Sequence, residues 1–205
     1  MTVIIDYGVG NLFSLKSSLA SLGIAAEVSG DREAICRAER IILPGVGAFG
    51  DAMAKLKESG LDKLLCRQAE EGKPLMGVCL GMQLLFEKSF EFCETEGLGL
   101  LPGRIVPIAP MIRPGLKVPH IGWNALDFSD AGKSSPIFKY INSGDYVYFV
   151  HSFAAVDCGQ SVLATAEYGG ELTAAVGQKN IFGMQFHPEK SGSVGLEILK
   201  AFCEM

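Results

Sequence analysis

A cysteine between two glycines gives this chain a candidate nucleophile. The segment Gly-Val-Cys-Leu-Gly at 77–81 follows an apolar run at 74–78 and precedes a helical pattern. Where a buried strand turns abruptly into a helix, side chains do not fit two positions before or after the turn residue. The pattern is therefore typical of a nucleophile elbow built on Cys79. The free N–H groups and the dipole of the helix would favour a thiolate. The competing interpretation is a structural cysteine beside two packing glycines.

His187 and Glu189 could supply the base and the group that orients it. A nucleophilic thiol needs a base within hydrogen-bond reach and a third group that holds this base in one tautomer. The sequence His-Pro-Glu follows a strand-like run at 181–186. Residues two apart in an extended segment face the same side, so the carboxylate could bond the imidazole locally. Alone the segment fits a surface turn, but together with Cys79 it predicts a Cys-His-Glu triad.

A glycine-rich loop at 44–50 has the spacing G-x-G-x-x-G between a predicted strand and a predicted helix. It does not fit a dinucleotide site, because it follows the third strand rather than the first. The acidic residues about 20 positions further on, Glu70 and Glu71, also lie in a helical stretch instead of at a strand end. Its bare backbone amides could instead stabilise an oxyanion, as acyl transfer requires.

Two other histidines and the single tryptophan carry weaker signals. His151 ends an apolar run and is typical of a hydrogen-bonded, half-buried histidine. His120 and Trp123 lie in the segment 119–124, directly after a proline-rich loop. A lone tryptophan is usually a core residue, but one beside glycine and asparagine equally fits an anchor for a partner protein.

Alternating strands and helices must position these residues. Apolar runs predict strands at 3–5, 24–28, 40–43 and 74–78. Amphipathic spacing predicts four helices. The first spans 12–22 with Asn11 as its cap, and a short second helix begins after its cap Asp31. The third spans 49–71 with a break near Gly60, and the fourth spans 79–88. Strand–helix units of this length form a parallel sheet with helices on both faces.

The second half of the chain has a different character. A proline-rich loop at 107–119 precedes strand-like runs at 120–128, 146–150, 161–167, 172–176 and 181–186. Hairpin turns are expected at 169–170 and 178–180, and a final helix at 194–202. We therefore expect a single α/β domain over 1–205, with a mostly parallel central sheet flanked by helices and an antiparallel extension.

Composition excludes several classes of protein. The formal net charge of −5 and a pI near 5.3 argue against nucleic acid or an anionic membrane as partner. No apolar run approaches the ~20 residues of a membrane span, and the first residues do not resemble a signal peptide. We expect a cytoplasmic chain whose six cysteines are reduced. The cysteines and the three histidines lack zinc-type spacing, so we expect no metal site.

Five segments together resemble the class I glutamine amidotransferases of the triad type, over essentially the whole chain. They are DYGVGN at 6–11, PGVGAF at 44–49, GVCLGMQ at 77–83, PHIGWN at 119–124 and FHPEKS at 186–191. The first and fourth are similar to the glutaminase subunits of imidazole glycerol phosphate synthases, which serve histidine biosynthesis. These two segments separate the chain from anthranilate- and carbamoyl-phosphate-type relatives. The resemblance implies a flavodoxin-like architecture.

The resemblance also implies roles for single residues. Cys79 would attack the side-chain amide of glutamine to give a thioester and ammonia, with His187 as general base and then acid, oriented by Glu189. The oxyanion would be held by the backbone N–H of Leu80 and of the loop Gly45, Val46 and Gly47. The amino-acid end of glutamine would be held by Gln83 and by the backbone of Ser152 and Phe153. Phe153 stands where the family often has tyrosine, so no hydroxyl contributes there.

No cofactor is implied, but a partner is. In the family the ammonia passes to a (β/α)₈ cyclase subunit in a heterodimer, which makes imidazole glycerol phosphate and AICAR. The interface would include Asn11, Trp123, Tyr148 and Lys190. The residues support a partner independently, because the chain is acidic and has no P-loop for a phosphorylated acceptor. A peptide between Gly45 and Gly47 could reorient at low steric cost, which predicts an oxyanion loop that is completed only when acceptor is bound.

Three alternatives remain open from the sequence. The first is a glutaminase subunit of another synthase, such as anthranilate or aminodeoxychorismate synthase, against which the segment 119–124 argues. The second is a scaffold without catalytic activity that docks a partner. The third is a cysteine peptidase or γ-glutamyl hydrolase that uses the same triad.

Overall fold

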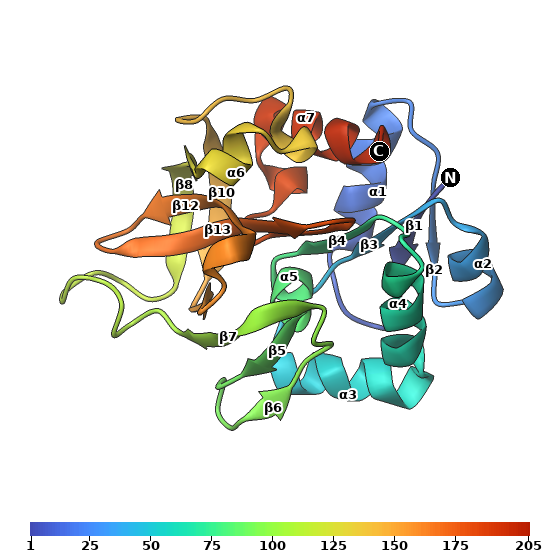
Figure 1. Cartoon of the computed structure of the whole chain (residues 1–205), viewed down its shortest axis with the longest axis horizontal. Helices are drawn as coiled ribbons and strands as arrows, with labels where there is room; N and C mark the ends of the chain where they lie inside the picture. Colours follow the sequence, from blue (N-terminus) through green and yellow to red (C-terminus); the bar gives the residue numbers. More distant parts are fainter.

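An eight-stranded sheet runs through the middle of the molecule (Figure 1). The computed structural model describes residues 1–205. The strand order is β2 (Ala26–Ser29), β1 (Thr2–Ile5), β3 (Arg40–Leu43), β4 (Leu75–Val78), β14 (Ile181–Met184), β13 (Glu171–Gln178), β12 (Val162–Glu167) and β9 (Asp127–Phe128). The strands from β2 to β14 are parallel, and those from β14 to β9 are antiparallel. The expected fold class is therefore confirmed.

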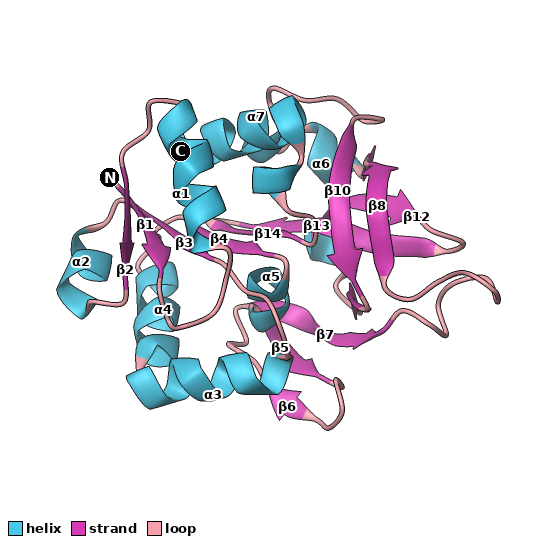
Figure 2. Ribbon diagram, turned by 180° about the vertical axis from the view of Figure 1, so that it is seen from behind, coloured by secondary structure: helices cyan, strands magenta, loops and turns pink.

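Helices cover both faces of this sheet, and the alternation of side chains along each strand divides the core between them (Figure 2). Val3 and Ile5 of β1 belong to the core under α3 (Phe49–Ser59) and α4 (Leu61–Glu70). Ile4 belongs to the opposite core, under α1 (Leu12–Ser21) and α7 (Gly192–Cys203). Because both faces are buried, the central strands read as continuous apolar runs. No helix in the chain has the length and apolar character needed to cross a bilayer.

Two smaller sheets lie beside the main one. The first pairs β8 (His120–Ala125) with β10 (Tyr146–His151) in antiparallel fashion. The second has the order β11 (Phe153–Val156), β7 (Leu101–Pro107), β5 (Phe86–Ser89) and β6 (Thr95–Glu96). The remaining short elements are α2 (Arg32–Arg37), α5 (Leu80–Leu84), α6 (Asp130–Lys133) and the 3₁₀ turns η1 (Pro136–Phe138), η2 (Gly159–Ser161) and η3 (Pro188–Lys190).

Local signals in the sequence placed many element boundaries correctly. Asp31 caps α2 by accepting a hydrogen bond from the Ala34 N–H at 2.9 Å. Gly60 separates α3 from α4 in a left-handed conformation with φ 68°. Both expected hairpin turns connect antiparallel neighbours, between β12 and β13 and between β13 and β14.

The expected helix at 79–88 is wrong beyond Leu84. Residues Phe86–Ser89 instead form β5, which pairs with β7. The helix ends because a returning segment takes its carbonyl groups: Leu84 accepts from the Leu98 N–H at 2.9 Å, and Leu85 from the Leu100 N–H at 2.8 Å. The strands β6, β7 and β11 were not predicted. The single strand-like run expected at 120–128 is divided into two strands, β8 and β9.

Helix α7 approaches η3 so closely that a side chain at Gly195 would collide with it. An added Cβ would lie 1.9 Å from the Pro188 carbonyl oxygen. We therefore expect Gly195→Ala to lower the free energy of unfolding by about 2 kcal/mol, since overpacking costs ~1–3 kcal/mol and exceeds the helix propensity gained. Urea denaturation measures this. Gly159→Ala is the control, because nothing lies within 4 Å of its added Cβ. Equal stabilities of the two variants would contradict the prediction.

Candidate active site

Cys79 lies at the turn between β4 and α5 in a backbone conformation that side chains rarely adopt. Its φ is 54° and its ψ is −113°. Such strain persists only where the surroundings impose it. The residue immediately precedes Leu80, the first residue of α5, and is 8% exposed. The structure thus has the elbow geometry expected from the sequence, with the cysteine at a helix N-terminus.

The two glycines beside Cys79 permit this turn by close backbone contact. An added Cβ at Gly77 would lie 2.5 Å from the Gly81 carbonyl oxygen. An added Cβ at Gly81 would lie 1.9 Å from the carbonyl oxygen of Leu43, at the end of β3. Neither position has room for a side chain, as the sequence pattern predicts.

His187 and Glu189 form a buried pair. The Nδ1 atom of His187 lies 2.8 Å from Oε1 of Glu189, and the two side chains are 3% and 1% exposed. The expected geometry needs one correction. His187 is extended, with φ −99° and ψ 99°, but Glu189 lies in the 3₁₀ turn η3. The turn, rather than strand alternation, brings the carboxylate to the imidazole.

The environment of His187 favours its protonated form. Burial lowers its pKa, but the interactions of the ring with the neighbouring Cys79 and Glu189 side chains outweigh burial and raise the pKa to about 9. Of the two oxygens of the Glu189 carboxylate, only Oε1 is hydrogen-bonded. The other, Oε2, is buried and has no partner within the chain. A buried carboxylate with an unpaired oxygen is costly, and an adjacent imidazolium compensates for it. The contact with Glu189 therefore favours the imidazolium form of His187.

Asn11 does not cap α1, contrary to the sequence prediction. It occupies the N-cap position, but its side chain makes no capping hydrogen bond. Its Nδ2 instead donates to Oε1 of Glu189 at 3.3 Å. The asparagine therefore joins the hydrogen bonds around Glu189.

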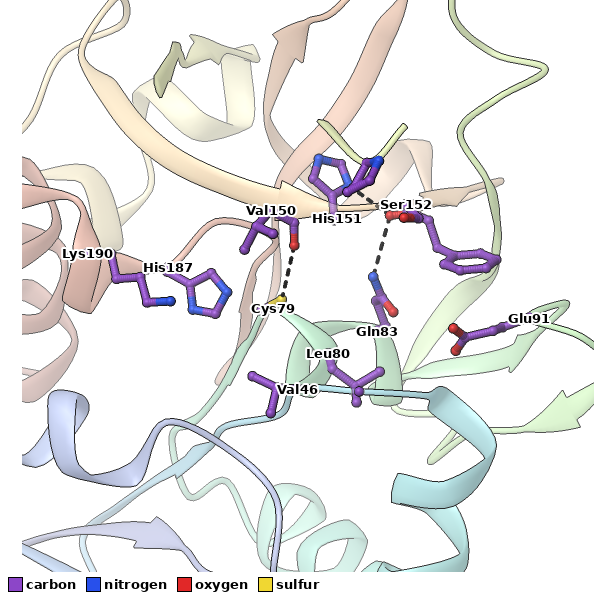
Figure 3. A pocket seen from close by; sticks show the side chains of 13 residues that line it. Val46, Cys79, Leu80, Gln83, Glu91, Val150, His151, Ser152, His187 and Lys190 are labelled. Carbon is purple, nitrogen blue, oxygen red and sulfur yellow. Dashed lines mark hydrogen bonds between the residues drawn. The ribbon is translucent and has the colours of Figure 1, made fainter. Parts of the chain in front are cut away.

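A pocket of about 340 Å³ opens onto Cys79. Figure 3 shows His187 and Lys190 at one end of it and Gln83 and Glu91 at the other, with Cys79 between. Its volume suits a ligand as small as one amino acid. Most of the residues predicted from the sequence line it. They are Cys79, His187, Val46, Gly47, Leu80, Gln83, Ser152, Phe153 and Lys190.

The glycine loop lies directly against the elbow. An added Cβ at Gly45 would be 2.8 Å from the Gly81 backbone nitrogen and 2.9 Å from Cβ of Leu80. The Leu80 N–H is the first of α5 and has no acceptor within that helix. The Tyr7 hydroxyl, which sequence reasoning missed, donates to the Pro44 carbonyl at 2.9 Å and fixes the start of the loop. Burial and the charge of Cys79 raise the Tyr7 pKa far above its usual value, so this hydroxyl remains a donor.

Glu91 lines the pocket but was not predicted from the sequence. Its Oε2 accepts a hydrogen bond of 2.6 Å from the Phe49 N–H, at the start of α3. The Glu91 carboxylate therefore occupies the N-terminus of α3, directly after the glycine loop. A dinucleotide site would need this space for phosphate. No sequence signal marks Glu91, because it follows β5 in a stretch that was predicted to follow a helix.

The residues predicted for a partner interface lie outside the pocket, except Lys190. Trp123 is 55% exposed, so it is not a core residue, and its ring meets that of Tyr148 edge-on at 6.0 Å. Lys190 is exposed at the pocket rim. Asn11 lies nearby through its contact with Glu189.

Comparisons with known proteins agree on the family. The model of the family "Glutamine amidotransferase class-I" matches residues 3–205. The imidazole glycerol phosphate synthase subunit HisH of Geobacillus thermodenitrificans is 49% identical over 205 residues, covering 98% of this chain and 94% of that protein. HisH of Listeria innocua is 47% identical over 205 residues, covering 100% and 96%.

A solved structure shows the same fold. A crystal structure of a glutamine amidotransferase superposes with a TM-score of 0.75 at 22% identity, covering 98% of this chain and 97% of that one. The matches to sequence and structure extend over the same residues, from the first strand of the sheet to the last helix. The chain belongs to the class I glutamine amidotransferase family, in the group of imidazole glycerol phosphate synthase HisH subunits.

Proposed function

We propose that this chain hydrolyses glutamine to glutamate and ammonia and delivers the ammonia to a synthase partner. One observation carries the proposal: the strained cysteine and the buried His187–Glu189 pair meet at a pocket sized for one amino acid. The relatives named as imidazole glycerol phosphate synthase subunits support it. Since the family model spans 3–205, we propose one amidotransferase domain over 1–205. The six unpaired cysteines suit a reducing compartment, so we propose the cytoplasm.

The triad would act in two half-reactions. In the first, His187 takes the thiol proton of Cys79, whose sulfur attacks the side-chain carbonyl carbon of glutamine, and the C–N bond then breaks. His187 gives its proton to the departing nitrogen, which leaves as ammonia, and a thioester remains on Cys79. In the second, His187 takes a proton from water, whose oxygen attacks the thioester. The C–S bond breaks, glutamate is released, and His187 returns the proton to the Cys79 sulfur. Glu189 keeps the imidazole in one orientation and stabilises its positive charge throughout.

Two backbone elements would hold the oxyanion of each tetrahedral intermediate. The Leu80 N–H at the start of α5 is one donor, and the loop of Gly45, Val46 and Gly47 is the other. Donors of this kind act in a site from which water is largely excluded, where they contribute most. Val46 and Gly47 are exposed, and Gly47 has φ 95°, so the loop is free to present its amides differently when a partner is bound.

The far end of the pocket would hold the amino-acid end of glutamine. Glu91 provides the carboxylate that a substrate ammonium group needs. Ser152 and Phe153 also line the pocket, and Nε2 of Gln83, which lies between Cys79 and Glu91 in Figure 3, donates to the Phe153 carbonyl at 3.4 Å. This arrangement would leave the side-chain amide of glutamine beside the sulfur.

The partner would be a (β/α)₈ cyclase subunit, bound as a heterodimer, that makes imidazole glycerol phosphate and AICAR from the ammonia. The face formed by Trp123, Tyr148, Asn11 and Lys190 would receive it. Exposed aromatic residues at such a site are typical anchors of protein interfaces. Three further exposed apolar side chains, those of Phe13, Ile121 and Tyr146, lie on the elements that form this face.

The decisive experiment measures glutamate release by this chain with and without a cyclase subunit and its ligand. We expect release to rise when both are present, because the oxyanion loop is then completed. Cys79→Ala should lower glutamine-dependent turnover by about a thousandfold or more, while turnover with added ammonia persists, because only the nucleophile is lost.

Two outcomes would contradict this prediction. Glutamine use retained by Cys79→Ala would exclude the triad. Turnover with chorismate and a chorismate-using partner, but none with the cyclase, would assign the chain to another synthase. Cys158→Ala is a matched control, because that cysteine is buried away from the pocket.

The pKa of His187 provides a second prediction. NMR titration should show it titrating near pH 9, and Glu189→Gln should lower this value toward 6.5, because a neutral amide stabilises the imidazolium less. Since the folded-state pKa is raised, the stability that this histidine contributes is fully present below about pH 6.5 and is lost as the pH rises through about 9. In Glu189→Gln this loss should shrink. A His187 pKa near 6.5 in the unaltered chain would refute the assignment.

Glu91 provides a third prediction. Glu91→Gln should raise the KM for glutamine about tenfold with a smaller change in kcat, since a charged hydrogen bond to the substrate contributes ~1.5–3 kcal/mol. The amide oxygen can still accept from the Phe49 N–H, so α3 keeps its partner. Glu94→Gln is the control, because that exposed carboxylate pairs only with Lys88. A KM equal to that of the unaltered chain would show that Glu91 does not bind the ammonium group.

A further inference from the structure

Two buried histidines near the pocket are not used by the triad. His120 of β8 and His151 of β10 are direct partners in the antiparallel ladder, and they are 2% and 5% exposed. Their side chains are in contact, with Nδ1 of His120 lying 3.1 Å from Nε2 of His151. His151 lines the pocket, and His120 does not.

The surroundings determine which nitrogen atoms carry hydrogen. Nδ1 of His151 lies 2.8 Å from the carbonyl oxygen of Phe153, which can only accept, so this nitrogen is the donor. Burial lowers the pKa of both histidines to about 4, so both rings are neutral at neutral pH. Nε2 of His151 is then bare and accepts, and Nδ1 of His120 must donate to it.

The other side of His120 agrees with this assignment. Its Nε2, which must be bare, faces the Nδ2 atom of Asn124 at 3.5 Å. That nitrogen is a donor, because it also bonds the Glu167 carbonyl at 2.7 Å. The His120 ring is stacked between Phe149 and Tyr168, with centroids at 4.8 and 4.1 Å and planes inclined by 20° in each case. The ring is therefore fixed on both faces and at both nitrogens.

The acceptor of this chain of bonds is part of the substrate pocket. Phe153 pairs with Pro107, which has no N–H, while the Ile108 N–H donates to the Ser152 carbonyl at 2.9 Å. Residues in an antiparallel ladder alternate in the direction of their hydrogen bonds, so the N–H and C=O of Phe153 both turn away from β7. Phe153 lines the pocket, and its carbonyl lies 2.8 Å from Nδ1 of His151. With glutamine bound as proposed, the Phe153 N–H would be available to the amino-acid end of the substrate.

The same carbonyl connects the histidines to the nucleophile. It also accepts from Nε2 of Gln83 at 3.4 Å, and that nitrogen donates to Oε1 of Gln185 at 3.0 Å. Nε2 of Gln185 in turn lies 4.0 Å from Sγ of Cys79. A change in the direction of the Phe153 carbonyl would therefore disturb both the binding end of the pocket and the side chain of Gln83.

We propose that His120 is a positioning residue for substrate binding: by donating to His151, it holds that ring in the tautomer that fixes the Phe153 backbone against the amino-acid end of the substrate. This inference rests on the proposed binding of glutamine in this pocket. His120 touches neither substrate nor Cys79, so its effect passes through His151 alone. It should appear in the KM for glutamine rather than in kcat.

Two variants separate this role from simple packing. His120→Phe keeps an aromatic ring between Phe149 and Tyr168 but removes the donor to His151. His120→Asn loses the stacked ring but places an amide nitrogen near the position of Nδ1. We expect His120→Phe to raise the KM for glutamine about tenfold with kcat changed less than about threefold, and His120→Asn to restore the KM to within about threefold of the unaltered chain. The reverse order would overturn the proposal, because packing alone would favour the phenylalanine.

A second measurement does not depend on turnover. The chain has only three histidines, so ¹⁵N-labelled histidine gives a spectrum that single substitutions can assign. We expect His151 to show a protonated Nδ1 and a bare Nε2 at pH 7, and His120→Phe to move the Nε2 signal. A charged His151, or one protonated at Nε2, would overturn the proposal even if no variant folds. A chain that shows the expected tautomer but does not hydrolyse glutamine would instead refute the proposed function.

Discussion

Backbone-to-backbone contact around Cys79 is the constraint on which the rest of the site depends. The ends of β3 and β4, the start of α5 and the glycine loop approach so closely that Gly45, Gly77 and Gly81 have no room for a Cβ. This contact forces Cys79 into a positive φ and places its sulfur above the end of the sheet. It also places Gly45 of the glycine loop against Leu80, the first residue of α5. The candidate nucleophile and the start of the loop are thus positioned by a single packing arrangement, which no side-chain rotamer can relax.

The three histidines near the pocket show how local charge decides their chemistry. All three are buried, and burial alone lowers the pKa of each. His187 lies beside two groups that can carry negative charge, Cys79 and Glu189, and these favour its imidazolium form. His120 and His151 hydrogen-bond only to each other, to the Phe153 carbonyl and to the Asn124 amide, and their rings remain neutral. The neighbours of each ring therefore separate a histidine suited to carrying a proton from two that each donate from one nitrogen and accept at the other.

The sequence predicted those parts of the site whose residue types are demanded by local geometry. The elbow at Cys79 could be recognised because only glycine fits at 77 and 81, and His187 because Glu189 is its near neighbour. Glu91, Tyr7 and Gln185 were missed because their roles depend on contacts between distant segments, which leave no local pattern. Asn11 was wrongly predicted to cap a helix for the same reason. A cap is a local possibility, but the Asn11 amide instead donates to Glu189, which lies 178 residues away in the chain. The strand β5 was taken for helix because its pairing with β7 cannot be seen in Phe86–Ser89 alone.

His187, the proposed base, is held by β10, the strand that also carries Tyr148 of the proposed partner face. The Tyr148 carbonyl accepts from the His187 N–H at 3.0 Å, and the Tyr148 N–H donates to the Ser191 hydroxyl, also at 3.0 Å. The Ser191 hydroxyl donates in turn to the His187 carbonyl. The N–H of His187 is therefore bonded to β10 directly, and its carbonyl is connected to β10 through Ser191. The ring of Tyr148 meanwhile contacts Trp123. Cys79, by contrast, is held at the end of the central sheet. A protein that docked on Trp123 and Tyr148 would therefore contact the strand that holds His187 rather than the strands that hold Cys79.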